Sequence, residues 1–390
     1  MEINIFLSLA IAMALALLSS KLMKIIHLPN VTGYLIIGLI AGPYCLNLLS
    51  IEVIERFSII PEIALGLIAF SIGAEFKLSY MKKIGKSPVI IATTAALGAV
   101  LLVDFILIIT GNDVSFSLLL GAIAAATAPA ATLMVVRQYK AKGPVTNTLL
   151  PVVAIDDAVA IMVFGLTVAI TKAINPQGSV SLASTLLDPV IEIFGALLFG
   201  AVMGYILKLL VDWFTGRGNR LSISFAMVLF CIGISDILGL SALLTCMAMS
   251  AVFVNISKFG EKVFEQMDRT TPPIFMLFFF ISGAELDLRI LPSVGVIGTL
   301  YVVFRIIGKV AGSALGGKIS HAEPVVTKYL GYTLIPQAGV AIGLSSIAMT
   351  VVPEYGVRIR TIVLCATVIY ELCGPVITKI ALIKAGEIAK

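Results

Sequence analysis

Two adjacent acidic residues, Asp156 and Asp157, lie well inside an apolar segment that covers residues 145–171. Carboxylates buried at such depth are costly, so they imply water access, a cation, protonation or a basic partner. Neighbours on a helix point about 100° apart, so one carboxylate can face a cavity while the other meets an adjacent helix. The pair can hold either a proton or a metal cation, and the two would compete for one site. A structural pair that only packs helices together is the alternative.

A basic partner is available in the apolar segment 291–317, where Arg305 and Lys309 lie one turn apart on one predicted helix face. Glycines on both sides of Lys309 permit close helix approach, so an ion pair between Lys309 and Asp156 is expected. A desolvated lysine can release its proton whereas arginine cannot, so we assign the switching role to Lys309 and a fixed charge to Arg305. The alternative is that both side chains reach out to the membrane surface.

Two other apolar segments are interrupted near their centres, at residues 126–130 and 334–339. Proline removes an amide donor, so each break frees carbonyls and amides that are tolerated at membrane depth only beside a cavity or polar partners. Helix ends at such breaks carry partial charges that can hold a small ion. Proline kinks without a ligand role are the alternative. Prolines and neighbouring side-chain oxygens mark the breaks at Thr127, Pro129, Thr132, Pro336 and Gln337.

The predicted cation site combines the two carboxylates with one hydroxyl and backbone carbonyls. Thr127 is the preferred neutral ligand because its hydroxyl lies beside the first break. The expected ligands are therefore Asp157, Asp156 and Thr127, with Lys309 coupling the site to protons. Supporting roles are expected for Arg305, Thr132, Pro129, Pro336 and Gln337.

The composition shows which elements must position these residues. The chain has 390 residues, of which 59% are hydrophobic and 13% are charged, whereas soluble chains carry about 25% charged residues. It is therefore expected to be an all-α, polytopic membrane protein without an appended soluble domain. The net charge of +5 comes from short basic clusters between apolar runs, which are typical of topology signals rather than of nucleic-acid binding. The five cysteines lack metal-ligand spacing and are expected to act as small hydrophobes.

Hydropathy, broken at proline, glycine and charge clusters, predicts about thirteen membrane spans. The first apolar run is expected to be a retained span rather than a cleaved signal peptide. With the N-terminus outside and the C-terminus cytoplasmic, most basic residues fall on the inner side, as the positive-inside rule requires. The expected spans are 3–21, 30–49, 59–76, 87–110, 114–137, 145–171, 183–211, 220–236, 238–256, 271–285, 291–317, 325–350 and 357–384.

The sequence of residues 70–78 is similar to that of residues 280–288, at an offset of 210 positions. Four consecutive spans keep step at this offset, and because seven spans separate corresponding members, the two copies must cross the membrane in opposite senses. The sequence therefore predicts an inverted repeat, with chance recurrence of a short motif as the alternative. Other acids in or near the spans are expected to be structural or interfacial: Glu62, Glu75, Asp104, Glu192 and Glu371.

The chain resembles the monovalent cation:proton antiporter superfamily, and most closely its NapA-type sodium/proton antiporters. The likeness covers nearly the whole chain. It rests on Asp156-Asp157 in a Val-Ala-Ile-Asp-Asp-Ala context, on Gly308-Lys309 before Gly312, on residues 70–75, and on the broken segments. The chain departs from the family at Ala128-Pro129, where a hydroxyl residue often follows the threonine, and at Arg305, which has no matching family role.

The resemblance implies an NhaA/NapA-like antiporter fold with two crossed discontinuous helices. It implies dimerisation (panel) helices over residues 1–86 and 220–290, a linker helix over 173–219, and core ion-transport helices over 87–172 and 291–390. It also implies a homodimer, a Na⁺ ligand role for Asp157 and a salt bridge between Asp156 and Lys309. No nucleotide-binding tail is expected after the last span.

The expected function is secondary transport in the cell membrane, with protons exchanged for Na⁺ or Li⁺ by alternating access. The exchange is expected to be electrogenic and to export the cation from the cytoplasm, with Na⁺ (or Li⁺ or K⁺) and H⁺ as transported ions and no cofactor. An enzyme is not expected, because the Gly-x-Gly-Asp and Gly-x-Ser-Gly strings of intramembrane proteases are absent from the sequence. The alternatives are a K⁺/H⁺ antiporter, a sodium-coupled organic-solute symporter and a passive channel.

Overall fold

The computed structural model describes residues 4–74, 76–78, 85–174, 182–286 and 295–388. All regular elements in these ranges are helices. The chain divides into two compact units, each made of two separate stretches of sequence. Unit 1 comprises Met1–Lys83 and Val190–Leu286, and unit 2 comprises Ile84–Pro189 and Asp287–Lys390. Whether the units act as panel and core remains a prediction.

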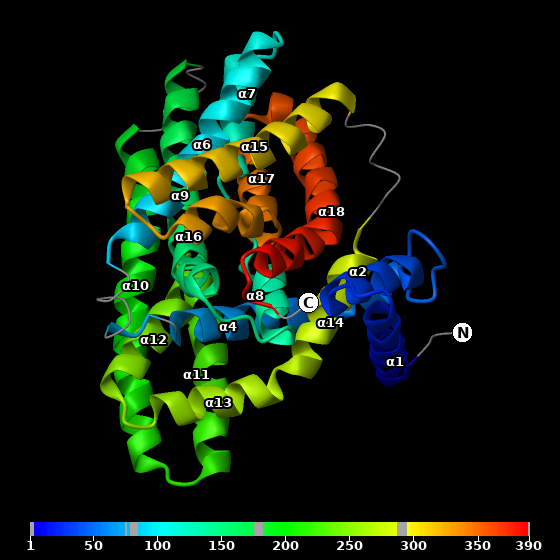
Figure 1. The fold of residues 1–390 in the computed structure, drawn as a ribbon, viewed down its shortest axis with the longest axis vertical. Helices are drawn as coiled ribbons and strands as arrows, with labels where there is room; N and C mark the ends of the chain where they lie inside the picture. Colours follow the sequence, from blue (N-terminus) through cyan, green and yellow to red (C-terminus); the bar gives the residue numbers. More distant parts are fainter. Residues whose placement is uncertain (1–3, 75, 79–84, 175–181, 287–294, 389–390) are drawn as a thin grey trace. The chain divides into compact units, whose positions relative to one another are not determined.

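Unit 1 is a helical bundle in which α2 packs against α14 and α4 packs against α12. Glycine permits these contacts, since a Cβ atom at Gly38 would overlap the Phe280 carbonyl of α14. The amphipathic helix α13 joins α12 to α14 along one edge of the unit (Figure 1). The helices are α1 (Ile5–Ile25), α2 (Asn30–Ala41), α3 (Ile51–Arg56), α4 (Ile59–Ala74), α10 (Leu182–Trp213, from Val190 on), α11 (Arg217–Leu238), α12 (Ala242–Ile256), α13 (Gly260–Thr270) and α14 (Pro272–Ala284).

Unit 2 is built around α6 and α15, which run side by side in close contact. A Cβ atom at Gly308 of α15 would lie 2.5 Å from the Gly98 carbonyl oxygen of α6, so only glycine fits there. This packing fixes the position of the polar residues of α15 along the length of α6. The elements are α6 (Ser87–Ile109), α7 (Val114–Ala124), α8 (Pro129–Gln138), α9 (Pro144–Ile174), α15 (Gly295–Ile319), α16 (Pro324–Tyr329), the 3₁₀ helix η2 (Leu330–Leu334), α17 (Gly339–Val351) and α18 (Pro353–Lys384).

Both expected breaks are present in unit 2. Residues 125–128 separate α7 from α8, and residues 335–338 separate η2 from α17. Pro129 is the first residue of α8, where its missing N–H is not needed, and the preceding Ala128 has the extended backbone that a residue before proline prefers. The two breaks meet, because the Ala128 amide donates to the Pro336 carbonyl at 2.8 Å.

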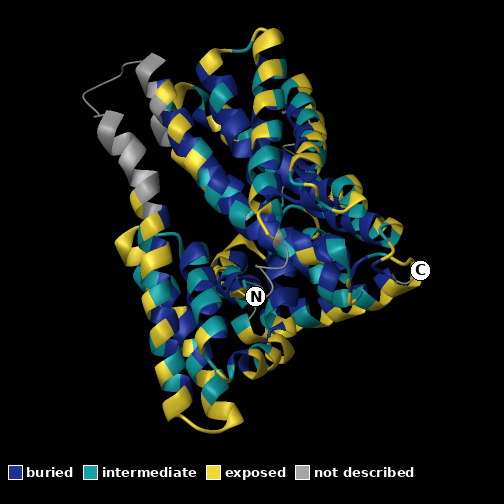
Figure 2. Ribbon diagram, turned by 60° about the vertical axis from the view of Figure 1, so that its left-hand side comes forward, coloured by how far each residue is buried: buried dark blue, intermediate teal, exposed yellow. Residues whose placement is uncertain are grey.

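Helices with exposed apolar faces dominate the surface, as a lipid environment requires. Figure 2 shows exposed residues along the outer faces of helices and buried residues on the faces turned inward. Seven described helices are long and apolar enough to cross a membrane, and shorter apolar helices accompany them. The number of crossings remains a prediction. Large apolar side chains with high exposure include Phe6, Phe105, Phe194, Leu198 and Trp213.

Several boundaries differ from the sequence-based expectation. The predicted span 30–49 is too long, because α2 ends at Ala41 before Gly42 and Pro43. Hydropathy also missed α3 and α13, which are short or amphipathic and so lack a long apolar run. Three cysteines are buried as expected, whereas Cys45 and Cys373 are exposed. Glu75 lies outside the described residues, and so does the side chain of Glu192.

Candidate ion-binding site

The acidic pair is buried in the middle of α9. Asp156 is 0% exposed and Asp157 is 3% exposed. The Lys309 ammonium of α15, itself 0% exposed, donates to Asp156 Oδ2 at 2.7 Å. Two buried opposite charges in contact stabilise each other, whereas either one alone would be strongly destabilising. The position of Lys309 excludes the alternative that it reaches the membrane surface.

Arg305 is also 0% exposed, one turn before Lys309 on α15. Its guanidinium donates to the carbonyls of Ala124 and Ala126 at 3.0 and 2.7 Å, at the end of α7. It donates to the Ile335 carbonyl at 2.7 Å, just after η2. The C-terminal ends of both interrupted segments carry partial negative charge, so one fixed cation neutralises both ends. Arg305 therefore clamps the two breaks together, and the membrane-surface alternative is wrong for this residue as well.

Polar side chains fill most of the remaining hydrogen-bonding capacity of the breaks. The Gln337 amide donates to the Ile123 carbonyl at 2.9 Å, and its oxygen accepts from the Tyr301 hydroxyl at 3.1 Å. Thr127 donates to the Leu334 carbonyl at 3.4 Å, and Thr132 donates across to the Thr333 carbonyl at 3.0 Å. Gln337 is thus already engaged with protein partners. The threonine oxygens keep lone pairs that a cation can use.

A single face of α15 organises these contacts. Tyr301, Arg305, Lys309 and Ser313 follow one another at intervals of four residues, and all are buried. Arg305 contacts the breaks and Lys309 contacts Asp156, and the rise of about 6 Å per four helical residues sets these two contacts close together. The structure therefore gathers the acidic pair, the lysine and both breaks around α15. Tyr301 was missed by the sequence reasoning, although its four-residue spacing from Arg305 was visible.

Unsatisfied carboxylate oxygens distinguish the acidic pair from a closed structural network. Within the described part of the chain, Asp156 Oδ1 and Asp157 Oδ1 are buried without a hydrogen-bond partner, and so is the Ser313 hydroxyl. Buried polar atoms normally have partners, so these oxygens are suited to receive a proton or a cation. The described residues hold no group of three or more His, Cys, Asp or Glu side chains of the kind that binds a metal cofactor.

Comparison with known proteins also indicates an ion transporter. The sequence model of a family described as "Sodium/hydrogen exchanger, transmembrane" matches residues 9–384. The chain belongs to the sodium/hydrogen exchanger family. It is therefore a multi-pass membrane transporter of this family and not an enzyme.

Two kinds of relative accompany the family match. A curated protein of Bacillus cereus, described as the probable Na⁺/H⁺ antiporter GerT, is 23% identical over 333 residues, which cover 83% of this chain and 84% of GerT. Two structures of the sodium proton antiporter MjNhaP1 from Methanocaldococcus jannaschii are similar at 19% identity, with TM-scores of 0.72 and 0.75. They cover 98% and 99% of this chain and 96% of MjNhaP1. This exchanger thus has an MjNhaP1-like antiporter fold.

Two further acids of unit 2 carry buried carboxylate oxygens. Glu371 of α18 is 4% exposed, and its Oε1 has no partner among the described residues. Asp104 of α6 likewise carries a buried oxygen without a partner there. The sequence predicts a structural or interfacial role for both acids, and the burial of the Glu371 side chain excludes an interfacial position for that residue. Their sequence signal was an acid within an apolar run, which does not separate a surface group from a buried one.

The helix that carries the acidic pair is capped from a distant part of the exchanger chain. Glu387 accepts hydrogen bonds from the Val145 amide at 2.5 Å and from the Thr146 amide and hydroxyl at 2.8 and 2.6 Å. These amides belong to the first turn of α9. A carboxylate at a helix N-terminus satisfies free N–H groups and matches the helix dipole. Glu387 therefore fixes the N-terminal end of α9.

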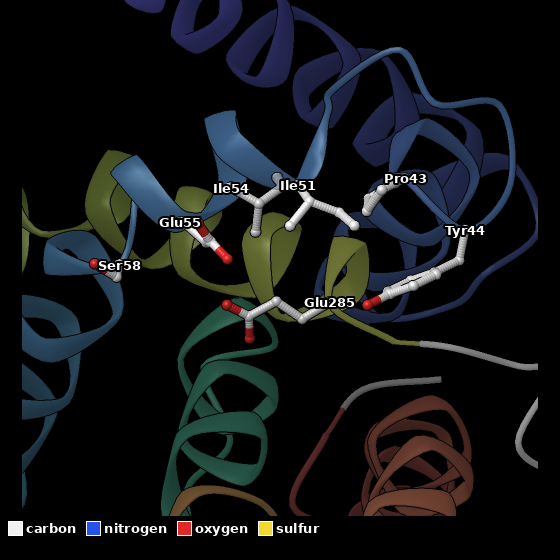
Figure 3. Close-up of a pocket in the computed structure, with 7 residues that line it drawn as sticks. All are labelled: Pro43, Tyr44, Ile51, Ile54, Glu55, Ser58 and Glu285. Carbon is white, nitrogen blue, oxygen red and sulfur yellow. The ribbon is translucent and has the colours of Figure 1, made fainter.

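A cavity of about 380 Å³ lies within unit 1, and none of the predicted site residues lines it. Figure 3 shows the Glu55 and Glu285 carboxylates turned toward one another across this cavity, with the Tyr44 hydroxyl at its side. The two acids are 230 positions apart in sequence, so no local motif could have indicated their proximity. The remaining lining residues are Pro43, Ile51, Ile54 and Ser58.

Proposed function

We propose that the chain exchanges protons for Na⁺ at a single site formed by Asp157, Asp156 and Thr127. The observation that carries the proposal is the buried ion pair of Lys309 with Asp156. The next residue, Asp157, has a buried Oδ1 without a hydrogen-bond partner among the described residues. Such a site can hold a bound proton or a bound cation, but each displaces the other. The family match and the likeness to proteins described as Na⁺/H⁺ antiporters support Na⁺ as the cation.

Lys309 would set the stoichiometry of the exchange. A cation that binds both carboxylates competes with the Lys309 ammonium for Asp156, and the desolvated lysine can then release its proton. Asp157 releases a second proton when it becomes a ligand. Two protons would therefore move against one Na⁺, and each cycle would transfer one net charge. A membrane potential of 100 mV then contributes about 2.3 kcal/mol to the exchange.

Alternating access would use the two broken segments as one body. Arg305 and the Ala128–Pro336 hydrogen bond join the breaks, so they would move together with α15. In the inward state, low proton activity releases the protons and the cation binds. In the outward state, protons displace the cation, so the cation is exported. We further propose thirteen spans, crossed broken helices and an inverted repeat, which the similarity of residues 70–78 to residues 280–288 and the paired interruptions support.

The finer assignments follow from the sequence. We propose an outside N-terminus and a cytoplasmic C-terminus, because the basic residues then fall on the inner side. The NapA-type branch is supported by the adjacent acids together with Lys309. A homodimer formed through unit 1 helices is supported by the resemblance alone.

The test is proton flux in proteoliposomes that carry a pH gradient, with Na⁺, Li⁺ and K⁺ added in turn. Wild type should dissipate the gradient with Na⁺ or Li⁺, and Asp157→Asn should abolish this flux. Asp236→Asn is the control, because it removes the same charge from an exposed position at the end of α11. Cation-dependent flux in Asp157→Asn would refute the site, and a response to K⁺ alone would replace the proposal by K⁺/H⁺ exchange.

A second measurement tests the role of Lys309. Lys309→Gln should retain exchange but lose its dependence on an imposed membrane potential, since only one proton would then move per cation. Lys318→Gln, at an exposed position of the same helix, should keep the dependence. Unchanged voltage dependence in Lys309→Gln would contradict the proposed stoichiometry.

A further inference from the structure

A second cavity, of about 430 Å³, lies within unit 2 between the start of η2 and the last turns of α18. Its polar lining residues are Lys328, Lys384, Tyr329 and Tyr332. Its apolar lining comes from α18. No carboxylate lines this cavity among the described residues, so its charge is positive. The apolar lining residues are Ile377, Ile380 and Ala381.

The two lysines are placed to act together. Lys328 lies in the last turn of α16 and Lys384 in the last turn of α18, and both are exposed. Lysines near helix C-termini are favoured by the helix dipole, so these ammonium groups are held near the ends of the two helices. In the described part of the chain, no ion pair joins either of them to a carboxylate. The Lys328 ammonium instead lies 5.2 Å from the centroid of the Tyr329 ring.

The apolar lining extends to the outside of the unit. Ile380 is 46% exposed and Tyr332 is 41% exposed, so the cavity opens beside an apolar helix surface. A phenol next to lysine beside such a surface is typical of the zone where lipid headgroups meet acyl chains. Two ammonium groups can bind a phosphate diester, while the isoleucines contact the first part of an acyl chain.

We propose that this cavity, lined by Lys328, Lys384, Tyr329 and Tyr332, binds an anionic phospholipid. The lysines bind the phosphate, the phenols contact the headgroup, and the α18 isoleucines contact the chain. A soluble phosphate uses only the lysines, so the apolar lining favours the lipid. Because η2 leads directly into the second break, a bound lipid also braces that segment against the end of α18.

The test measures lipid binding to the purified full chain, independently of transport. Dioleoylphosphatidylglycerol is titrated into the protein in detergent, and bound lipid is counted by native mass spectrometry while Tm is followed. The matched series use dioleoylphosphatidylcholine and inorganic phosphate. Wild type is expected to bind the phosphatidylglycerol selectively and to show a raised Tm.

The double variant Lys328→Gln/Lys384→Gln is expected to bind phosphatidylglycerol about 30-fold more weakly. This factor corresponds to about 1 kcal/mol for each lysine near an anionic headgroup. The control is Lys140→Gln/Lys318→Gln, which removes two exposed lysines of the same unit outside the cavity and should bind as wild type does. The single variant Ile380→Asn should weaken lipid binding without changing the response to phosphate.

Three results would overturn the proposal. They are equal phosphatidylglycerol binding by the Lys328/Lys384 variant, equal binding of phosphatidylcholine by wild type, and equal stabilisation by inorganic phosphate. Failure of Na⁺/H⁺ exchange would leave these outcomes unaffected, because binding is measured without a gradient.

Discussion

The two units bury different kinds of polar side chain. In unit 1, the buried polar residues of the described chain are serines and threonines, such as Ser71, Ser235 and Thr245. In unit 2, the buried set also includes acids, a lysine, an arginine and a glutamine. Among the described residues, the ion pairs of unit 1, such as Lys77 with Glu261 and Arg269 with Glu265, join exposed or half-buried side chains.

This difference follows from the cost of burying charge. A hydroxyl can return its hydrogen bond to the carbonyl of the preceding helical turn, as Ser250 does with Met247, so it fits any helix interface. A buried charge needs a specific opposite partner, and neutral apolar residues would often be as stable or more stable. Charges that remain buried in one unit only are therefore best explained by what they do there. Four sets of substitutions test this difference between the units.

The largest loss of stability is expected from breaking the buried ion pair. Lys309→Ala leaves Asp156 as an uncompensated buried charge, which costs about 3–5 kcal/mol. The double variant Asp156→Asn/Lys309→Gln removes both charges and should recover most of this loss. Tm in detergent measures both. A double variant no more stable than Lys309→Ala would show that the charges do not compensate one another.

The next largest effect is expected at Arg305. Arg305→Lys keeps the charge but loses the fork that contacts three carbonyls, and hydrogen bonds to charged groups contribute about 1.5–3 kcal/mol each. We expect a loss of about 2–3 kcal/mol, because lysine recovers part of the contacts, together with strongly reduced exchange. Arg217→Lys, at an exposed position of unit 1, is the control and should change neither Tm nor exchange. Wild-type Tm in Arg305→Lys would show that the breaks hold together without the clamp.

Glycine contacts should affect both units alike. Gly308→Ala in unit 2 and Gly38→Ala in unit 1 each place a Cβ atom against backbone, and overpacking costs about 1–3 kcal/mol. We expect similar falls in Tm for both, which would show that the units differ in buried charge and not in packing. Gly233→Ala has no heavy atom within 4 Å of the new Cβ and should be neutral or slightly stabilising. A loss confined to Gly308→Ala would make packing part of the difference.

The smallest effect is expected at the exposed pair of unit 1. The Lys77 ammonium beside Glu261 lowers the pKa of that carboxyl below its ordinary 4.5. A lowered pKa contributes stability above the ordinary value and loses it as the pH falls through the lowered one. Glu261→Gln should therefore reduce Tm barely measurably at pH 7, and the difference should vanish on acidification or in high salt. A fall in Tm as large as that of Arg305→Lys would contradict the comparison.

Side-chain type and helical spacing made much of the candidate site predictable. The contact of Lys309 with Asp156 could be expected, because an acid and a base inside apolar segments have few other ways to be buried. The positions of the breaks could be expected from Pro129 and Pro336, since proline lacks the N–H group that a continuous helix needs. The helical membrane class followed from composition, and the apolar segments followed from hydropathy along the chain.

The clamp of Arg305 could not be predicted, because the groups that it joins at the two breaks are backbone carbonyls. Every residue carries a carbonyl, so no sequence pattern marks Ala124, Ala126 or Ile335 as acceptors. The cavity lined by Glu55 and Glu285 could not be predicted either, because two acids far apart in sequence give no sign that they lie close together. Hydropathy did not predict the amphipathic helix α13, because it averages the apolar and polar faces of the helix.

The hydrogen bonds between Glu387 and the first turn of α9 join positions 242 residues apart. At a synthesis rate of about 5–20 residues per second, Glu387 is therefore made roughly 12–50 s after the first turn of α9. During this interval the first-turn amides of α9 lack their Glu387 acceptor. The hydrogen bonds to Glu387 can form only late in biogenesis. Ribosome-bound chains that stop short of Glu387 should consequently exchange the Val145 and Thr146 amide hydrogens faster than released chains.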